Sequence, residues 1–288
     1  MNQKIVKIKT ADNIEHTGLL YSPIKETKKV VVHVHGLAGN FYENSFIDFQ
    51  AESFTKNGYS YFVFNNRGNG HLTDLIKKEN NGITFVDGGA TFELFESSYY
   101  DIESAINYAL SLGYEEIILQ GHSYGCNKVI YYYLKSKIKN IKKIILLAPC
   151  DIYTELKSFI DDYDSYVLSC KEKVATGLGH EIVFNNIFPP EAFSAQTFIS
   201  DFLENVPADI FRYRNKDFVN EQLTRIDIPV LIQIGNNDNY ALTADKNDVI
   251  KYLNNNFKDL KLLFIENTNH GYVGKEQEMS DNCIKFII

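Results

Sequence analysis

The sequence predicts a fold of the α/β class, with a mainly parallel central sheet flanked by helices. Two observations support this prediction. Strand-like and helix-like segments alternate along much of the chain. Some strand-like segments have the mainly apolar composition of buried strands, such as the β-branched run from Val30 to His35 and the segment from Tyr59 to Phe64. Such runs are expected for strands buried on both faces, and their alternation with helices is typical of parallel sheets.

The predicted elements have clear boundaries in the sequence. Residues 4–9 and 14–21 alternate like two strands joined by a turn. Helical patterns at 45–57 and 97–112 are each followed directly by a glycine, a residue that commonly ends helices. The remaining strands are predicted at 116–120, 143–148, 229–234 and 261–265, and the remaining helices at 124–137, near 243–255 and at the end of the chain.

One long segment breaks this alternation. Residues 151–226 are rich in Phe, Tyr and Asp and hold no clear strand pattern. A structureless loop of that length would be abnormal inside a compact domain unless it covered a site. We therefore expect a helical lid at 151–226 over a core formed by residues 1–150 and 227–288.

Composition and charge exclude several classes of partner. The net charge is −8 and the chain has no basic run, which argues against a nucleic-acid partner. No apolar run approaches the roughly 18 residues that a membrane helix needs, and the first residues lack the apolar block of a signal peptide. The four cysteines form no CxxC pair and no metal-binding spacing. We expect a cytoplasmic protein with reduced thiols and neither a metal nor an organic cofactor.

Ser123 is the candidate nucleophile. It lies in the pentapeptide Gly121-His-Ser-Tyr-Gly125, between a predicted strand and a predicted helix. That pattern is typical of a serine on a tight strand-to-helix turn, where flanking glycines let the backbone bend and the hydroxyl faces outward. The alternative interpretation is a structural glycine turn with an incidental serine.

A nucleophilic serine needs a base within hydrogen-bond reach, and we expect it to be His270. This residue follows the last predicted strand, from which a side chain can reach the carboxyl ends of the central strands. The alternative is a surface histidine without a catalytic role. His122 adjoins Ser123 in sequence, but the backbone direction is expected to point its side chain elsewhere.

An acid is expected between the serine and the histidine in the chain order Ser, Asp, His. Asp238 follows the strand at 229–234 directly and is our choice, with Asp151 as the rival after the strand at 143–148. Asp238 could instead satisfy loop amides, which is a common use of aspartate in turns.

An oxyanion needs two backbone N–H donors. We expect one from Tyr124, which follows the serine, and one from Leu37, in the loop His35-Gly-Leu-Ala-Gly-Asn40. The alternative interpretation of that loop is an ordinary glycine turn.

Together these residues resemble the α/β-hydrolase superfamily. The motifs His35-Gly36, Asn66–Gly70, Gly121–Gly125, Asn237-Asp238 and His270-Gly271 occur in the superfamily's order, and the resemblance spans essentially the whole chain. Within the superfamily, the chain is most similar to bacterial serine esterases and acyl hydrolases, including carboxylesterase-like, feruloyl-esterase-like and macrolide-esterase-like enzymes with a lid. Ser123 counts against epoxide hydrolases and dehalogenases, which need an aspartate nucleophile.

The resemblance implies a serine hydrolase, acting as a monomer or homodimer, that cleaves a carboxylic ester of a small molecule, with a bulky lactone or aryl ester preferred. Alternatives on the same triad are a thioesterase, a C–C hydrolase or a peptidase, and from another class a ligand-binding receptor with slow turnover. The candidate substrate contacts are His35, Tyr153, Phe184, Phe188 and Tyr240.

Overall fold

The centre of the molecule is a large mixed sheet. The computed structural model describes residues 1–80, 82–136, 138–183 and 192–288. The strands of the main sheet in these ranges are β1 (Asn2–Lys9), β2 (Ile14–Ser22), β3 (Lys29–Val34), β4 (Ser60–Phe64), β5 (Thr73–Glu79), β6 (Gly82–Gly88), β7 (Glu116–His122), β8 (Ile141–Leu147), β11 (Val230–Gly235) and β12 (Leu260–Ile265). Their order is β12-β11-β8-β7-β3-β4-β2-β5-β6, with β1 paired to β2.

Six neighbouring strands, from β12 to β4, run parallel, while β1, β2, β5 and β6 pair antiparallel. The parallel strands at the centre are apolar and buried, as in β3, where Val30, Val31, Val32 and Val34 have no exposed surface. Burial on both faces explains why these strands read as continuous apolar runs in the sequence.

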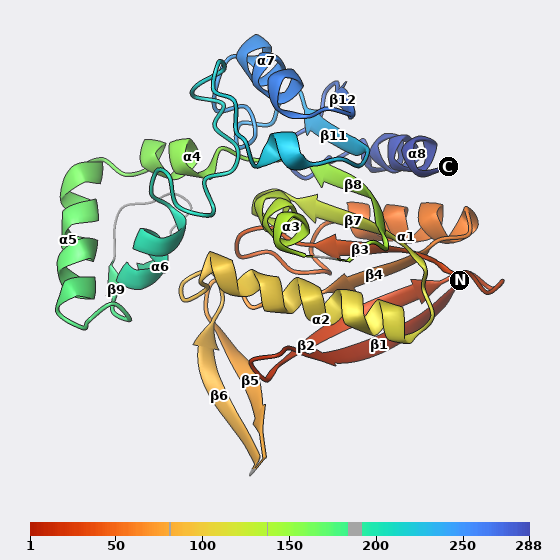
Figure 1. The fold of residues 1–288 in the computed structure, drawn as a ribbon, viewed down its shortest axis with the longest axis horizontal. Helices are drawn as coiled ribbons and strands as arrows, with labels where there is room; N and C mark the ends of the chain where they lie inside the picture. The colour runs from red at the N-terminus through yellow and green to blue at the C-terminus, as the bar shows by residue number, and fades with distance from the viewer. Residues whose placement is uncertain (81, 137, 184–191) are drawn as a thin grey trace.

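Helices cover both faces of the sheet (Figure 1). They are α1 (Phe46–Lys56), α2 (Ser98–Ser111), α3 (Tyr124–Lys135), α7 (Lys246–Asn256) and α8 (Glu276–Ile287). In the view of Figure 1, α2 and α3 lie in front of the sheet and α1 lies behind it. The helices α1 and α8 pack together, and Gln50 of α1 contacts Met279 and Cys283 of α8. Within the described ranges, no helix is long and apolar enough to cross a membrane.

The segment predicted as a lid contains short elements. They are α4 (Ile152–Ser158), α5 (Tyr163–Ala175), α6 (Ala195–Asp201), the strands β9 (Ile182–Val183) and β10 (Phe193–Ser194), and the 3-10 turn η2 (Leu223–Arg225). The two strands form their own antiparallel pair, and two residues are too few to show an alternating pattern in a sequence. The division into core and lid stays a prediction.

The hairpin formed by β5 and β6 is absent from the predicted elements. It extends the antiparallel end of the sheet and projects from the body (Figure 1). Ile83 and Phe85 are exposed on β6, and charged residues dominate β5. A strand pattern was not evident because this projecting hairpin buries little on either face, so the usual alternation of apolar and polar residues does not arise.

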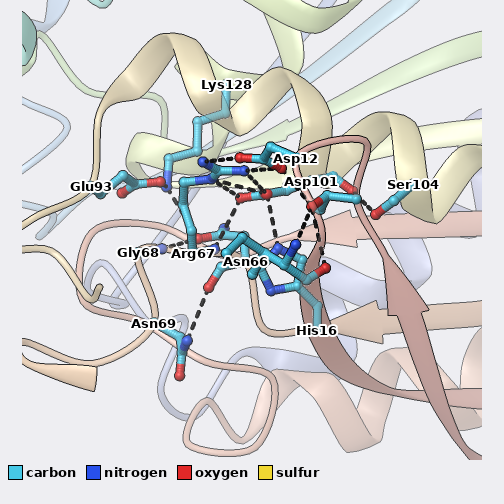
Figure 2. A network of polar contacts seen from close by, with 12 residues as sticks. Asp12, His16, Asn66, Arg67, Gly68, Asn69, Glu93, Asp101, Ser104 and Lys128 are labelled. Atoms are coloured by element: carbon cyan, nitrogen blue, oxygen red, sulfur yellow. Dashed lines mark hydrogen bonds and ion pairs between the residues drawn. The ribbon is translucent and has the colours of Figure 1, made fainter. Parts of the chain in front are cut away.

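A buried ionic cluster around Asp101 joins three parts of the body (Figure 2). The Asp101 carboxylate, on α2, accepts hydrogen bonds from the backbone N–H and the guanidinium of Arg67, with distances between 2.8 and 3.1 Å. His16 of β2 lies 2.8 Å away through Nε2, and Asp12 pairs with the outer side of Arg67 at 3.1 Å. Burial would raise the pKa of Asp101, but His16 and Arg67 outweigh it and hold the pKa below its usual value.

We expect Asp101→Asn to lower the free energy of unfolding by about 3–5 kcal/mol, because it leaves the Arg67 charge buried without its main partner. Urea unfolding at pH 7 measures this. The matched control is Glu115→Gln, which breaks an exposed ion pair with Lys28 and should cost nothing measurable. Equal stability of Asp101→Asn and wild type would contradict this account.

The lowered pKa of Asp101 also predicts how stability depends on pH. A carboxyl whose folded pKa lies below its unfolded value stabilises the fold above the unfolded pKa of about 4, and this contribution is lost as the pH falls through the folded pKa. The stability difference between wild type and Asp101→Asn should therefore shrink as the pH is lowered below about 4. A difference that stays constant down to acid unfolding would contradict the assignment.

Candidate active site

The candidate catalytic residues all follow strands of the parallel part of the sheet. Ser123 follows β7, Asp238 lies three residues after β11, and His270 lies in the loop after β12. Because β7, β8, β11 and β12 are parallel neighbours, their carboxyl ends lie at one edge of the sheet. This is the edge where open α/β sheets hold their ligands.

Ser123 has a strained backbone. Its φ is 55° and its ψ is −131°, a conformation that costs a non-glycine residue about 1–3 kcal/mol. The residue stands between the end of β7 and the first residue of α3, so that its hydroxyl lies at the positive end of a 12-residue helix. This is the strand-to-helix context in which the glycine-flanked pattern indicates a nucleophile.

Three glycines let the turn around Ser123 pack against the end of β3. A Cβ on Gly125 would lie 2.2 Å from the carbonyl oxygen of Val34, and one on Gly121 would lie 2.6 Å from that of Gly125. A Cβ on Gly36 would lie 2.7 Å from the Cβ of Ser123. No side chain fits at these three positions, so the sequence requires glycine there.

His270 is paired with Asp238. The imidazole Nδ1 lies 3.0 Å and 2.9 Å from the two carboxylate oxygens, and the Asp238 side chain is fully buried while that of His270 is 20% exposed. The carboxylate also accepts the backbone N–H groups of Tyr240 and Ala241. Because a carboxylate can only accept a hydrogen bond, Nδ1 carries the proton and donates to Asp238, and Nε2 of a neutral imidazole is then free to act as a base.

Asp151 is engaged elsewhere. Its side chain accepts the N–H of Thr154 at the start of α4, and it pairs with Arg214 at 2.7 Å. The structure thus brings Asp238 to His270 and uses Asp151 as a helix cap and ion-pair partner.

In the described part of the chain, Ser123 is not hydrogen-bonded to His270, its expected base. In the described residues, the contact that Oγ makes is with Sγ of Cys150 at 3.8 Å, and no hydrogen bond joins Oγ to His270. Catalytic hydrogen bonds are often long before a substrate binds, so this geometry is compatible with a serine–histidine pair. Burial raises the pKa of the Cys150 thiol well above its ordinary value, so that Cys150 stays an uncharged neighbour.

The expected oxyanion donors lie on two adjacent segments. Tyr124 is the first residue of α3, where an N–H has no acceptor inside the helix. Leu37 belongs to the loop after β3, where the Gly36 carbonyl accepts the N–H of Gly39. The proximity of Gly36 to Ser123 brings this loop next to the serine.

His35 is hydrogen-bonded to the backbone of the loop after β3. It is 1% exposed, its Nε2 accepts the N–H of Asn66 at 2.9 Å, and its Nδ1 therefore donates to the carbonyl of Gly36 at 2.9 Å. Burial, with a smaller effect of Lys128, lowers the pKa of His35 to about 3 and keeps the ring neutral. His35 is a predicted substrate contact, but it is buried and both of its ring nitrogens are hydrogen-bonded to the protein, so it is not placed to contact a substrate.

The other candidate substrate contacts differ in position. Tyr240 is 37% exposed, and its ring centroid lies 5.1 Å from that of His270. Tyr153 packs inside the 151–226 segment, with the guanidinium of Arg214 4.6 Å from its ring centroid. Phe184 and Phe188 lie outside the described residues. Tyr240 is thus the candidate that stands beside the paired imidazole.

A second buried cluster was not anticipated from the sequence. Lys128 of α3 is fully buried, pairs with Glu93 and contacts Oδ1 of Asn66 at 3.3 Å (Figure 2). Nearby, Asp201 of α6 accepts the N–H of Phe95, and burial raises its pKa well above the ordinary value, which favours the neutral acid. A lysine within the apolar stretch of α3 was the available signal, since a buried lysine is rare without a partner.

The predicted direction of the His122 side chain is wrong. The side chain points toward the His270 loop, and its Nε2 lies 2.9 Å from the backbone oxygen of His270. Its place directly before Ser123 was the available signal.

Within the described ranges, no group of three or more His, Cys, Asp or Glu side chains is arranged to hold a metal ion.

Comparison with solved structures shows the fold. The chain is 16% identical to DcsB, solved in complex with its substrate analogue, with a TM-score of 0.70 over 99% of this chain and 98% of that one. It is 16% identical to Est1E from Butyrivibrio proteoclasticus (TM-score 0.63, covering 98% and 97%) and 13% identical to the siderophore hydrolase EstB from Aspergillus fumigatus (TM-score 0.70, covering 99% and 97%). A comparison with curated protein sequences found no match.

The family comparison agrees with the solved structures. A family model described as the alpha/beta hydrolase fold matches residues 29–177, which is just over half of the 288 residues. The predicted fold class is therefore confirmed. The chain belongs to the alpha/beta hydrolase fold family.

Proposed function

We propose that the chain is a serine hydrolase that cleaves a carboxylic ester with Ser123, His270 and Asp238. The observation that carries the proposal is the pairing of His270 Nδ1 with the buried Asp238 carboxylate, at the sheet edge where Ser123 occupies a strained strand-to-helix turn. A carboxylate, an imidazole and a serine in these positions match the roles of acid, base and nucleophile in acyl transfer. Membership of the alpha/beta hydrolase fold family supports the same class of reaction.

In the proposed mechanism, Nε2 of His270 takes the proton of Ser123 Oγ as that oxygen attacks the ester carbonyl carbon. The backbone N–H groups of Tyr124 and Leu37 stabilise the oxyanion of the tetrahedral intermediate. The imidazolium, held by Asp238, then gives its proton to the departing alkoxide as the C–O bond breaks. Water, deprotonated by the same imidazole, attacks the acyl-enzyme carbonyl. The bond from the acyl carbon to Ser123 Oγ then breaks, the imidazolium returns its proton to Oγ, and the carboxylic acid is released.

For the substrate we propose a partly apolar ester, with an aryl ester or a lactone preferred. Tyr240 supports this, because a half-exposed ring beside His270 offers an aromatic surface next to the reacting carbonyl. Among the similar structures, Est1E has been solved with ferulic acid bound, and EstB is a siderophore hydrolase. Ferulic acid carries an aromatic ring on its acyl chain, which supports the preference for a bulky aromatic ester.

We expect the purified protein to hydrolyse p-nitrophenyl or aryl esters and Ser123→Ala to lose this activity. Removal of the nucleophile should lower kcat by on the order of 10⁶-fold, to the level of background hydrolysis. Initial rates across acyl chain lengths and aryl esters measure both the activity and the size of the acyl group accepted. Equal rates for wild type and Ser123→Ala would remove Ser123 from the mechanism.

The two aspartates should separate catalysis from stability. Asp238→Asn should lower kcat by about 10⁴-fold, because the amide no longer holds the imidazole in the required tautomer. Asp151→Asn breaks the pair with Arg214 and should lower the melting temperature while kcat stays near the wild-type value. Steady-state kinetics and thermal unfolding of both variants test this assignment. If Asp151→Asn lost activity and Asp238→Asn kept it, the catalytic acid would be Asp151.

A further inference from the structure

Two side chains are hydrogen-bonded to His270: Asp238, its proposed partner in catalysis, and His122, which is not among the three proposed catalytic residues. The His270 ring is bound by Asp238 through Nδ1, and its backbone oxygen lies 2.9 Å from Nε2 of His122. A carbonyl oxygen can only accept, so Nε2 of His122 carries the proton and donates it. The two imidazole rings lie 4.9 Å apart between their centroids.

The surroundings of His122 protect this hydrogen bond from water. The residue is 5% exposed, and its ring packs edge-on against Phe46, with ring centroids 5.1 Å apart. The ring centroid of Tyr272 lies 6.4 Å from that of His122. Burial, reinforced by the neighbouring His270, lowers the pKa of His122 to about 3. The ring is therefore a neutral donor, which places no second positive charge beside an imidazole that becomes cationic during acyl transfer.

Several hydrogen bonds hold the loop that carries His270. The Tyr272 hydroxyl donates to the Gln233 carbonyl, and the Asn269 side chain accepts the N–H groups of its neighbours at 271 and 273. The loop follows β12, and Asn267 and Tyr272 both adopt positive φ values, of 56° and 57°. The Tyr272 N–H closes a turn on the Asn269 carbonyl, but the His270 carbonyl lies inside that turn and is bound by His122. Among the described residues, His122 supplies the hydrogen bond to the His270 carbonyl, and it therefore constrains the orientation of that peptide.

We propose that His122 is a positioning residue that fixes the His270 backbone relative to Ser123. The inference rests on the proposed function, because it concerns the geometry of the same serine–histidine pair. His122 is covalently next to Ser123, so its hydrogen bond to His270 ties the turn that carries the nucleophile to the loop that carries the base. The two groups then keep their relative positions, although they lie 147 residues apart in the chain.

Two substitutions at His122 separate the hydrogen bond from packing. His122→Phe keeps a planar ring but has no donor, whereas His122→Gln keeps an N–H donor on a flexible side chain. The matched control is His33→Phe, because His33 is also a buried histidine packed edge-on against Phe46, at 5.9 Å, and its Nδ1 has no hydrogen-bond partner. Thermal unfolding of all three variants verifies that each is folded at the assay temperature.

With an aryl ester as substrate, we expect His122→Phe to lower kcat by on the order of 10-fold with little change in KM. This is the size of effect expected when one hydrogen bond that positions the base is lost. His122→Gln should recover most of this loss, and His33→Phe should stay close to wild type. The inference is overturned if His122→Phe keeps the wild-type kcat, if His122→Gln fails as badly as His122→Phe, or if His33→Phe shows the same loss.

A second readout does not need turnover. The Nδ1 proton of His270, bound to Asp238, should give a low-field proton NMR resonance that disappears in His270→Ala. We expect that resonance to broaden in His122→Phe through faster exchange with water, and to persist in His122→Gln and His33→Phe. If wild type hydrolyses no ester, the proposed function fails while this comparison still decides the positioning role; an unchanged resonance in His122→Phe overturns it.

Discussion

The site depends on how closely the turn after β7 approaches the end of β3. The Cα of Gly125 packs against the carbonyls of Val34 and His35, and Gly36 packs against Ser123 itself, with no space for a Cβ. This packing holds Ser123 at a positive φ that an isolated chain would avoid. It also sets the loop after β3, which carries one expected oxyanion donor, against the turn that carries the other.

Buried polar groups behind that loop determine its shape. Asn66 connects them, because its N–H donates to His35, its side-chain oxygen accepts from Lys128, and its side-chain amide donates to the His35 carbonyl. The buried charges form ion pairs: Lys128 pairs with Glu93, and Arg67 pairs with Asp101 (Figure 2). Buried charges are tolerated only with such partners, so this part of the fold is specified by polar contacts as well as by apolar packing.

The sequence predicted the parallel strands well because each is a buried apolar run, and it predicted the proximity of Asp238 and His270 because both follow neighbouring strands. Features that depend on tertiary contacts were missed. The burial of Lys128 depends on its pairing with Glu93, which lies before α2. The hydrogen bond of His122 depends on the path of a loop 148 residues later in the chain. The β5–β6 hairpin was missed because a projecting hairpin buries few side chains, so burial imposes no regular alternation on its sequence.

The central claim is that Ser123 is a nucleophile activated by His270. The most direct test is to treat the protein with a fluorophosphonate and to locate the adduct by peptide mass spectrometry. The account predicts one adduct, on the peptide that contains Ser123, and a much slower reaction in His270→Ala. The account would be contradicted by an adduct on a different residue, by no adduct at all, or by an unchanged labelling rate in His270→Ala.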